Sequence, residues 1–363
     1  MRFVCVAGAR PNFMKIAPVL AALEGQHGEC VLVHTGQHYD DAMSTVFFDE
    51  LGIRAPDRHL EVGSGSHAEQ TARVMAAFEP VVAEVEPDCV VVVGDVNSTM
   101  AAAIVAAKAG SRVAHVEAGL RSRDWSMPEE INRVVTDRVS DYLLAPSDDA
   151  VANLRSEGYG EDQIHLVGNV LVDTLLTNRA RALERRPHER LGLPDHYGVI
   201  TLHRPALVDN ADLLADVVKA LGEIARDVPL VFPAHPRTAS ALRNVDVPDG
   251  VHLIEPVGYL DFLGLQAGAA VVLTDSGGIQ EETTVLGVPC LTLRENTERP
   301  ITVEHGTNKL VGLDPGTIVA TARQVLAEGV TPRCPALWDG HAGERIAAVL
   351  MSERLPMRPT TLR

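Results

Sequence analysis

The stretch Thr274-Asp275-Ser276-Gly277-Gly278-Ile279-Gln280-Glu281-Glu282 directly follows an apolar run, Ala-Ala-Val-Val-Leu, at 269–273. Such a run is typical of a buried parallel strand, and Asp275 and Ser276 are residue types that often begin helices. Gly277 and Gly278 let a backbone or a ligand approach closely because they have no Cβ. The stretch therefore predicts a strand, a glycine turn and a helix start whose free N–H groups can hold a phosphate. An ordinary capped helix without a ligand fits the same residues.

The same succession of strand, turn and helix recurs along the whole chain. Apolar runs predict further strands at 3–7, 30–34, 88–93, 112–116, 142–145, 199–202, 230–232, 251–254 and 288–293. Segments with helical spacing lie between most of them, which predicts an α/β fold with doubly wound parallel sheets. The length of 363 residues predicts two domains, and the charged segment 168–190 is where we place the change between them. We expect two Rossmann-like domains that face each other across a cleft.

Composition limits the partners of the protein. The chain is 46% hydrophobic and 22% charged, with a formal net charge of -17, which argues against broad binding to nucleic acid or to an anionic membrane. Its five cysteines are scattered and include no Cys-x-x-Cys pair, which favours a reduced, cytoplasmic protein. No apolar run approaches the roughly 18 residues of a membrane helix, and the N-terminus does not have the pattern of a signal peptide.

Several polar residues of the first half stand just beyond predicted strands, where open α/β sheets bind ligands. They are Arg10, Gln37, Asp95 and Glu117. Asp95, Glu117 and Glu129 are the candidates for acid–base work, because half-desolvated carboxylates can have raised pKa values. Two ordinary roles compete with this interpretation. Asp95 could be the N-cap of the next helix, and Glu129 could form a helix ion pair with Arg133, four residues on.

A second group of residues has the chemistry to bind an anion. Its members are Arg10, Lys15, Arg133, His203, His235, Arg299 and the helix start at Ser276-Gly277-Gly278. Arg can hold a phosphate through two parallel hydrogen bonds, although a surface salt bridge is the ordinary role of any single Arg. The 14 histidines show no metal-ligand spacing and the chain has no G-x-G-x-x-G. Neither a metal nor a dinucleotide cofactor is therefore predicted.

Together these residues resemble the non-hydrolysing UDP-N-acetylglucosamine 2-epimerases. The matching segments are Gly8-Ala9-Arg10-Pro11 with Lys15, Thr35-Gly36-Gln37-His38, Gly94-Asp95, His115-Val116-Glu117-Ala118-Gly119-Leu120-Arg121, Pro128-Glu129-Glu130 with Asn132-Arg133, Gly168-Asn169, His203-Arg204, Asp275 through Glu282, and Thr297-Glu298-Arg299-Pro300. The resemblance implies a glycosyltransferase-B-type fold. Its domains would span 1–167 and 168–344, with a C-terminal helix at about 345–363 returning to the first domain.

The resemblance also implies a reaction. A base removes the carbon-2 proton of the sugar as UDP leaves carbon 1, giving a 2-acetamidoglucal, and UDP adds back while a proton returns to the other face. The residues that match catalytic positions of the family are Asp95, Glu117, Glu129 and His203. Those implied for substrate binding are Arg10, Lys15, Arg133, His235, Ser276, Gly277, Gly278, Glu282 (on the ribose) and Arg299. A UDP-sugar substrate, a homodimer and no cofactor are expected.

Two departures from the family pattern stand out. Ala206-Leu207 replace a usual Glu-Asn pair, and Asp40 and Glu69 differ in chemistry from residues near a candidate allosteric set formed by Gln37, His38 and Gln70. Three other functions stay open: the hydrolysing epimerase that releases UDP and N-acetylmannosamine, a glycosyltransferase on the same fold, and a catalytically silent UDP-sugar-binding protein. The residues do not select the sugar, for which a 3-acetamido or uronic acid variant is an alternative.

Overall fold

The computed structural model describes residues 1–36 and 50–352 and divides the chain into two compact units. Unit 1 consists of Met1–Thr174 with Ala336–Arg363, and unit 2 consists of Leu175–Pro335. Unit 1 thus takes more residues at both junctions than the sequence-based boundaries at 167 and 344. Each unit is a parallel sheet covered by helices, which confirms the predicted fold class.

The sheet of unit 1 has seven parallel strands in the order β3-β2-β1-β4-β5-β6-β7. They are β1 (Arg2–Ala7), β2 (Glu29–His34), β3 (Arg58–His59), β4 (Cys89–Val93), β5 (Arg112–Val116), β6 (Tyr142–Ala145) and β7 (Ile164–Leu166). The valine-rich β4 is buried along its whole length, as expected for a central strand of a sheet covered on both faces. The strand order reverses between β1 and β4, so the ligand position of such sheets lies beyond the carboxyl ends of these strands.

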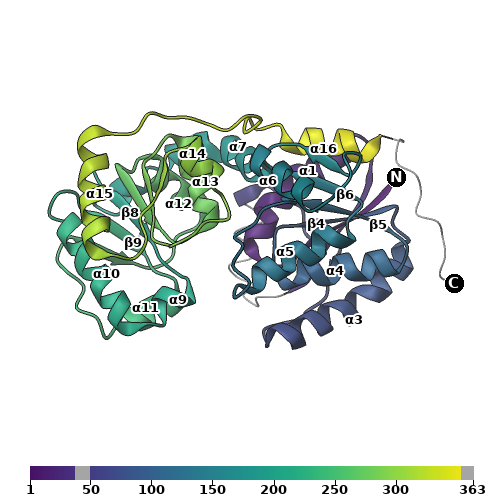
Figure 1. The fold of residues 1–363 in the computed structure, drawn as a ribbon, viewed down its shortest axis with the longest axis horizontal. Helices are drawn as coiled ribbons and strands as arrows, with labels where there is room; N and C mark the ends of the chain where they lie inside the picture. The colour runs from purple at the N-terminus through teal and green to yellow at the C-terminus, as the bar shows by residue number, and fades with distance from the viewer. Residues whose placement is uncertain (37–49, 353–363) are drawn as a thin grey trace. The chain divides into compact units, whose positions relative to one another are not determined.

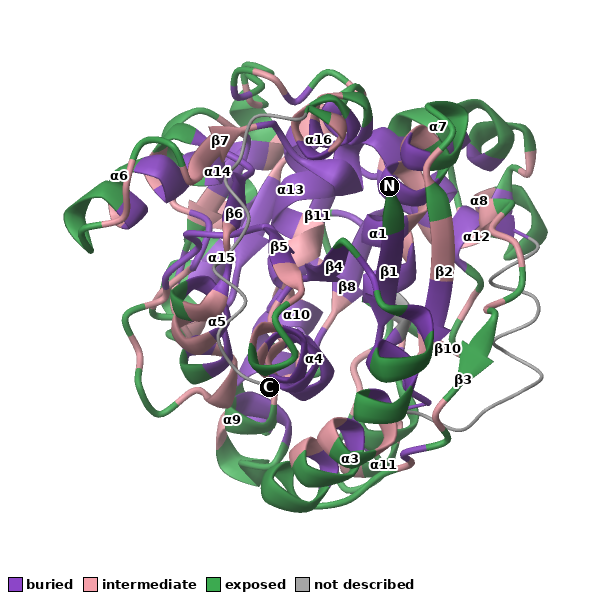
Figure 2. Ribbon diagram, turned by 90° about the vertical axis from the view of Figure 1, so that its right-hand side faces the viewer, coloured by how far each residue is buried: buried purple, intermediate pink, exposed green. Residues whose placement is uncertain are grey.

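Helices cover both faces of this sheet (Figures 1 and 2). They are α1 (Arg10–Gly25), α3 (His67–Val85), α4 (Asn97–Lys108), α5 (Pro128–Val139), α6 (Asp148–Ser156) and α16 (Ala342–Met351). A further helix, α7 (Val170–Glu184), begins in unit 1 and continues into unit 2. Apolar residues of α1 and α16 pack on one face, and those of α3 and α4 pack on the other. Figure 2 shows that most of β1 is buried, whereas the edge strand β3 is exposed.

The helix α16 packs on α1 at the other end of the chain (Figure 1). The approach is close, because a Cβ on Gly343 would lie 2.6 Å from the backbone oxygen of Pro18. Asp173 holds the start of α16 by accepting hydrogen bonds from the N–H groups of Ala342 (3.1 Å) and Gly343 (2.7 Å). Burial raises the pKa of this carboxyl. The C-terminal helix is therefore part of the core of unit 1.

The sheet of unit 2 has six parallel strands in the order β10-β9-β8-β11-β12-β13. They are β8 (Gly198–Thr201), β9 (Leu230–Pro233), β10 (Val251–Ile254), β11 (Val271–Thr274), β12 (Cys290–Thr292) and β13 (Asn308–Leu310). The helices are α8 (Pro187–Arg190), α9 (Pro205–Val208), α10 (Ala211–Ile224), α11 (Pro236–Leu242), α12 (Tyr259–Ala267), α13 (Gly277–Leu286), α14 (Ile301–Glu304) and α15 (Pro315–Glu328). Helices α10 and α15 pack on one face, and α12 and α13 on the other. The order reverses between β8 and β11, which places a second ligand position beyond their carboxyl ends.

Two local differences from the predicted elements affect the functional residues. Helix α4 begins at Asn97 with Val96 as its N-cap, so Asp95 is not the capping residue. The short helix α9 follows His203 and was not predicted. Within α9, Leu207 enters the hydrophobic core of unit 2. The apolar residue that departs from the family pattern thus has a packing role.

Candidate active site

The turns after β4 and β5 place two carboxylates at neighbouring strand ends. Gly94 has a φ of +69° and Glu117 a φ of +71°, a conformation that is costly for a residue with a side chain. The backbone is held there by hydrogen bonds from Gly94 N–H to Val116 O (3.1 Å) and from Glu117 N–H to Leu144 O (3.1 Å). Asp95 and Glu117 therefore owe their position to the sheet and not to a local helix.

Glu117 is the most enclosed of the candidate carboxylates. Its side chain is 3% exposed, and its Oε2 lies 2.6 Å from Lys15 Nζ on α1. Its Oε1 is buried and has no hydrogen-bond partner among the residues that the structure describes. Leaving a buried acceptor unpaired costs about 1–3 kcal/mol, so this oxygen is positioned for a partner that binds. The strained backbone and the unsatisfied oxygen occur at the same residue, as is common in functional sites.

Asp95 is held by Arg133 of α5. Its Oδ2 accepts hydrogen bonds from Arg133 Nε at 3.0 Å and Nη2 at 2.6 Å. Arg133 also donates to Glu130 from Nη1 at 2.6 Å. The Asp95 side chain is 26% exposed, whereas Arg133 is buried. The buried guanidinium therefore orients the carboxylate, which stays accessible to a ligand.

The ion pair that competed with a catalytic role for Glu129 is not formed. Arg133 pairs instead with Glu130, three residues before it, and with Asp95. Glu130 also accepts hydrogen bonds from the N–H groups of Ser122 and Arg123, so it anchors the loop before α5. Glu129 is half-buried and has no hydrogen bond or ion pair within the described part of the chain.

The candidate allosteric residues are only partly visible. Gln37 and His38 lie outside the described residues, as does the side chain of Arg10, whose backbone begins α1. Gln70 is buried, and its Oε1 accepts a 2.7 Å hydrogen bond from Asn97. Asn97 in turn accepts from Asn132, which also donates to the backbone oxygen of Asp95 at 2.9 Å. Gln70 thus supports the Asp95 turn.

In unit 2, Asp275 organises the loop after β8. Its carboxylate accepts hydrogen bonds from the backbone N–H groups of His203 (2.9 Å) and Arg204 (2.8 Å) and lies 3.0 Å from His203 Nδ1. Burial alone would raise the pKa of Asp275, but these contacts, led by His203, hold it below its usual value. Asp275 therefore holds the His203 ring, whose side chain is 49% exposed, just beyond the end of β8.

The helix α13 begins without a side-chain cap. Ser276 is its N-cap residue, but no side-chain hydrogen bond closes the helix start, and Asp275 is turned toward His203. The ordinary capped helix considered from the sequence is therefore absent. Gly277 and Gly278 form the first turn of α13, where N–H groups have no partner within the helix and the helix dipole is positive. This helix start has the properties of an anion site.

Arg299 lies against this helix start. A Cβ on Gly277 would lie 2.7 Å from Arg299 Nη1 and 2.6 Å from Glu298 Oε1, so only glycine allows the contact. Arg299 is paired with Glu281 at 2.9 Å and with Glu298 at 2.8 Å. Glu298 is bound in addition by Arg294 at 2.9 Å. These buried pairs fix the guanidinium of Arg299 beside the N–H groups of α13.

Glu282 lies deeper in the same helix and is 3% exposed. Its Oε2 accepts a 2.7 Å hydrogen bond from Gln266. Burial raises the pKa of Glu282 to about 7, with Glu281 adding to the shift and the contacts to Gln266 and Tyr259 opposing it. The carboxyl of Glu282 therefore changes its charge near neutral pH.

A pocket of about 220 Å³ opens beside His203 within unit 2. Its lining comes from the ends of β8 and β9 and from the segment that leads into α12: Thr201, Leu202, His203, Pro233, His235, Pro256, Val257 and Phe262. His235 is the N-cap residue of α11 and lies in this lining. The mixture of apolar walls and two imidazoles is suited to a planar polar ring.

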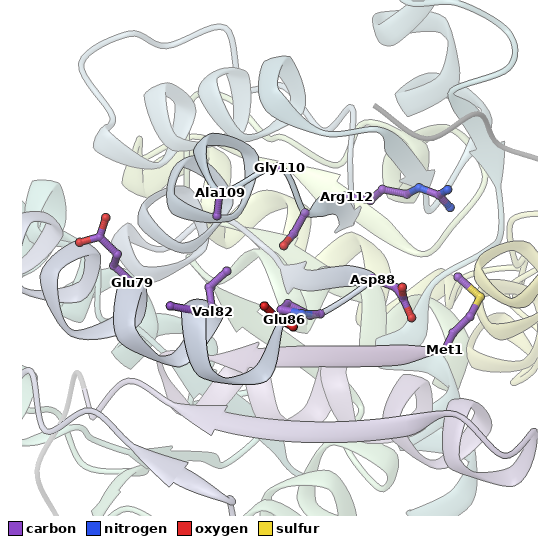
Figure 3. Close-up of a pocket in the computed structure, with 11 residues that line it drawn as sticks. Met1, Glu79, Val82, Glu86, Asp88, Ala109, Gly110 and Arg112 are labelled. Carbon is purple, nitrogen blue, oxygen red and sulfur yellow. The ribbon is translucent and has the colours of Figure 1, made fainter. Parts of the chain in front are cut away.

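A larger pocket in unit 1, of about 650 Å³, opens at the amino ends of the strands (Figure 3). Its lining includes Met1, Asp88 and Arg112, which precede or begin β1, β4 and β5. The candidate carboxylates follow the opposite, carboxyl ends of the same strands. We therefore do not assign the substrate to it.

Neither metal-binding groups nor membrane helices occur in the described ranges. Within residues 1–36 and 50–352, no group of three or more His, Cys, Asp or Glu is placed to hold a metal ion. In the same residues no helix is both long and apolar enough to cross a membrane.

The sequence matches the model of a family of nucleotide-sugar enzymes. The model of the UDP-N-acetylglucosamine 2-epimerase family matches residues 21–351. The chain belongs to this family.

Individual relatives agree with the family assignment. The UDP-N-acetylglucosamine 2-epimerase of Methanocaldococcus jannaschii is 42% identical over 96% of this chain and 99% of its own. The crystal structure of that archaeal enzyme with UDP-GlcNAc and UDP superimposes with a TM-score of 0.90 over 96% of this chain and 99% of that chain. A UDP-2,3-diacetamido-2,3-dideoxy-D-glucuronate 2-epimerase of Pseudomonas aeruginosa is 40% identical over 96% of this chain and 99% of its own.

The structure thus groups the predicted residues by unit. In unit 1 it brings together Lys15 with Glu117 and Arg133 with Asp95, and in unit 2 it gathers His203, His235, the start of α13 and Arg299. Sequence reasoning missed the supporting roles of Asp275 and Glu130. It placed Asp275 at a helix start and Glu130 within a matching segment, and only their contacts show which backbone groups they hold.

Proposed function

We propose that this member of the epimerase family is a non-hydrolysing UDP-N-acetylglucosamine 2-epimerase that interconverts UDP-GlcNAc and UDP-ManNAc. The observation that carries the proposal is the buried Glu117 carboxylate, with one oxygen on Lys15 and the other without a partner. A base that removes the proton from carbon 2 must be ionised, enclosed and free on one oxygen. The family match and the archaeal relative with 42% identity support the substrate class.

Unit 1 supplies the acid–base groups in this proposal. Inversion at carbon 2 removes a proton from one face of the sugar and returns one to the other, which needs two groups or one relay. Glu117 is enclosed and cation-paired, whereas Asp95 is oriented by Arg133 and remains partly exposed. Glu129 is free of ion pairs in the described residues and is the third candidate. The proposal assigns proton transfer to this trio without dividing the two faces among its members.

Unit 2 holds UDP. The diphosphate would accept hydrogen bonds from Ser276 and from the N–H groups of Gly277 and Gly278, with Arg299 adding positive charge. His203, oriented by Asp275, would donate a hydrogen bond to the diphosphate and so stabilise the charge that develops there as the bond to carbon 1 breaks. The pocket lined by His235 fits the base, and Glu282 is proposed for the ribose. Arg10, as the family resemblance implies, would also contact the diphosphate.

The chemistry needs no redox cofactor. Elimination of UDP gives a 2-acetamidoglucal, in which carbon 2 has lost its proton and its configuration. Re-addition of UDP to carbon 1 with proton delivery from the opposite face gives the epimer, so atoms and charges balance within the substrate and the acid–base groups. The active assembly is proposed to be a homodimer, which light scattering on the purified protein would measure.

One alternative substrate has a specific observation in its favour. The Pseudomonas aeruginosa relative, 40% identical, acts by its name on a diacetamido uronate sugar. A UDP-sugar modified at carbon 3 or carbon 6 would undergo the same elimination, because neither position takes part in it.

Proton NMR of UDP-GlcNAc with the purified protein in D2O tests the proposal. Deuterium entering carbon 2 together with UDP-ManNAc is the expected result. Free N-acetylmannosamine with UDP would identify the hydrolysing reaction instead. No change with UDP-GlcNAc, but exchange with UDP-2,3-diacetamido-2,3-dideoxy-D-glucuronate, would establish the modified substrate, and no exchange with either would refute the epimerase.

A further inference from the structure

Beneath the ends of β4 and β5 lies a buried charged group that the proposed chemistry does not use. His115, on β5, and Asp137, on α5, are both completely buried. His115 Nδ1 lies 2.6 Å from Asp137 Oδ1, and its Nε2 lies 2.8 Å from the backbone oxygen of Gly94. The ring therefore links Gly94, which precedes Asp95, to α5, which carries Arg133.

Neither neighbour of the ring has a proton to offer. The Gly94 oxygen is a carbonyl and can only accept. Asp137 Oδ2 accepts from Gly119 N–H at 3.1 Å and is paired with Arg121 at 2.7 Å, an arrangement that fits an ionised carboxylate. Burial alone would raise the pKa of Asp137, but His115 and Arg121 together hold it below its usual value. Both nitrogens of His115 must then donate, and an imidazole that donates from both nitrogens is an imidazolium.

We propose that His115 is held as a permanent imidazolium and acts as a positioning residue for Asp95 and Glu117. The statement about catalysis rests on the proposed function, whereas the statement about protonation does not. The ring fixes the backbone of the Gly94–Asp95 turn to α5, while Arg133 of the same helix fixes the Asp95 side chain. Backbone and side chain of Asp95 are thus held by one rigid element. Glu117 directly follows β5, two residues after His115, so the contacts of the His115 ring also restrain its backbone.

The charges around the ring favour this state. Its positive charge is paired directly with Asp137, which limits the cost of burying both ions. Arg121 also pairs with Asp137, and its own positive charge is balanced by Glu157 through two hydrogen bonds of 2.8 and 2.7 Å. Tyr159 is a further titratable neighbour of this group.

Nitrogen-15 NMR of the whole protein labelled at histidine tests the protonation state without substrate. The His115 signals are assigned by their loss in His115→Gln. Both ring nitrogens are expected to carry protons, and their signals should stay unchanged between pH 6 and 9. In Asp137→Asn the amide donates to Nδ1, so the ring should become the neutral Nε2–H tautomer. An unprotonated Nδ1, or titration in the ordinary range, in the wild-type protein would overturn the proposal.

Kinetics test the positioning role. His115→Gln and Asp137→Asn are each expected to lower kcat about 10- to 100-fold with KM changed less than about threefold. His252→Gln, on the exposed β10 surface, is the matched control and should change neither. A wild-type kcat in the folded variants, or a change in KM as large as the change in kcat, would overturn the role. If the wild-type protein shows no epimerase activity, the proposed function fails, and the NMR of the ring still decides its protonation.

Discussion

Lys15 Nζ lies 2.6 Å from Glu117 Oε2, although 102 residues separate the two along the chain. The contact joins the first helix of unit 1 to the end of β5, and Glu117 Oε1 is buried without a hydrogen-bond partner among the described residues. The positive charge of Lys15 thus lies directly against the Glu117 carboxylate. The unpartnered oxygen is then the group most suited to receive a proton from the substrate.

Glu117→Gln should abolish proton transfer while leaving nucleotide binding in place. The amide cannot accept the carbon-2 proton, so hydrogen exchange at carbon 2 is expected to fall about 10²–10⁴-fold. UDP affinity, measured by calorimetry, should change less than about threefold, because UDP is assigned to unit 2. The matched control is Glu161→Gln, an exposed carboxylate paired with Arg155, which should leave both quantities unchanged. Full exchange activity in Glu117→Gln would remove Glu117 from the mechanism.

Gly277→Ala should weaken UDP binding about tenfold or more. The new Cβ would lie 2.7 Å from Arg299 Nη1 and 2.6 Å from Glu298 Oε1, and both side chains are buried in ion pairs that resist displacement. A tenfold loss corresponds to about 1.4 kcal/mol. Gly25→Ala, where nothing lies within 4 Å of the added Cβ, is the control for the loss of a glycine in a helix. Equal UDP affinities for the two variants would argue against a phosphate site at the start of α13.

Glu282→Gln should reduce the sensitivity of stability to pH. The pKa of Glu282 is raised from 4.5 to about 7, so the folded protein keeps a proton that the unfolded chain loses as the pH rises through this interval. Stability contributed by this group is therefore present below pH 4.5 and falls as the pH rises to about 7. Gln cannot ionise, and the variant should gain about 2–3 kcal/mol relative to the wild type between pH 4.5 and 8.

Urea unfolding of the whole protein at several pH values measures this difference in the free energy of unfolding. Glu304→Gln, an exposed change in the same unit, is the control and should run parallel to the wild type. A Glu282→Gln curve that also runs parallel to the wild type would contradict the raised pKa.

Gly343→Ala should destabilise unit 1 without touching the proposed chemistry. Its Cβ would lie 2.6 Å from the backbone oxygen of Pro18, which belongs to α1 and cannot move aside as a side chain can. Overpacking of this kind costs about 1–3 kcal/mol. Thermal unfolding should show a lower midpoint, and carbon-2 exchange at low temperature should match the wild type. An unchanged midpoint would mean that α16 is not held against α1.

The local sequence patterns were sufficient for most of the elements and for the family. Continuous apolar runs predicted the more buried strands of both sheets, because burial on both faces requires apolar residues along each strand. They did not predict the short outer strands β3, β7 and β13, which are exposed or only partly buried. Asp95, Glu117, Ser276 and Gly277 were singled out from their positions after such strands. The position is informative because the carboxyl ends of parallel strands meet at one edge of the sheet.

The pairing of these side chains was decided only by the tertiary structure. Helix spacing favoured Glu129 as the partner of Arg133, whereas Arg133 bonds Glu130 and, across 38 residues, Asp95. The order of the strands, not the sequence interval, brings Lys15 to Glu117 and His115 to Asp137. Hydrogen bonds and ion pairs act over a few ångströms, so they depend on which strands become neighbours. Sequence by itself therefore determined the fold class and the chemical types present, and the strand order determined which charges meet.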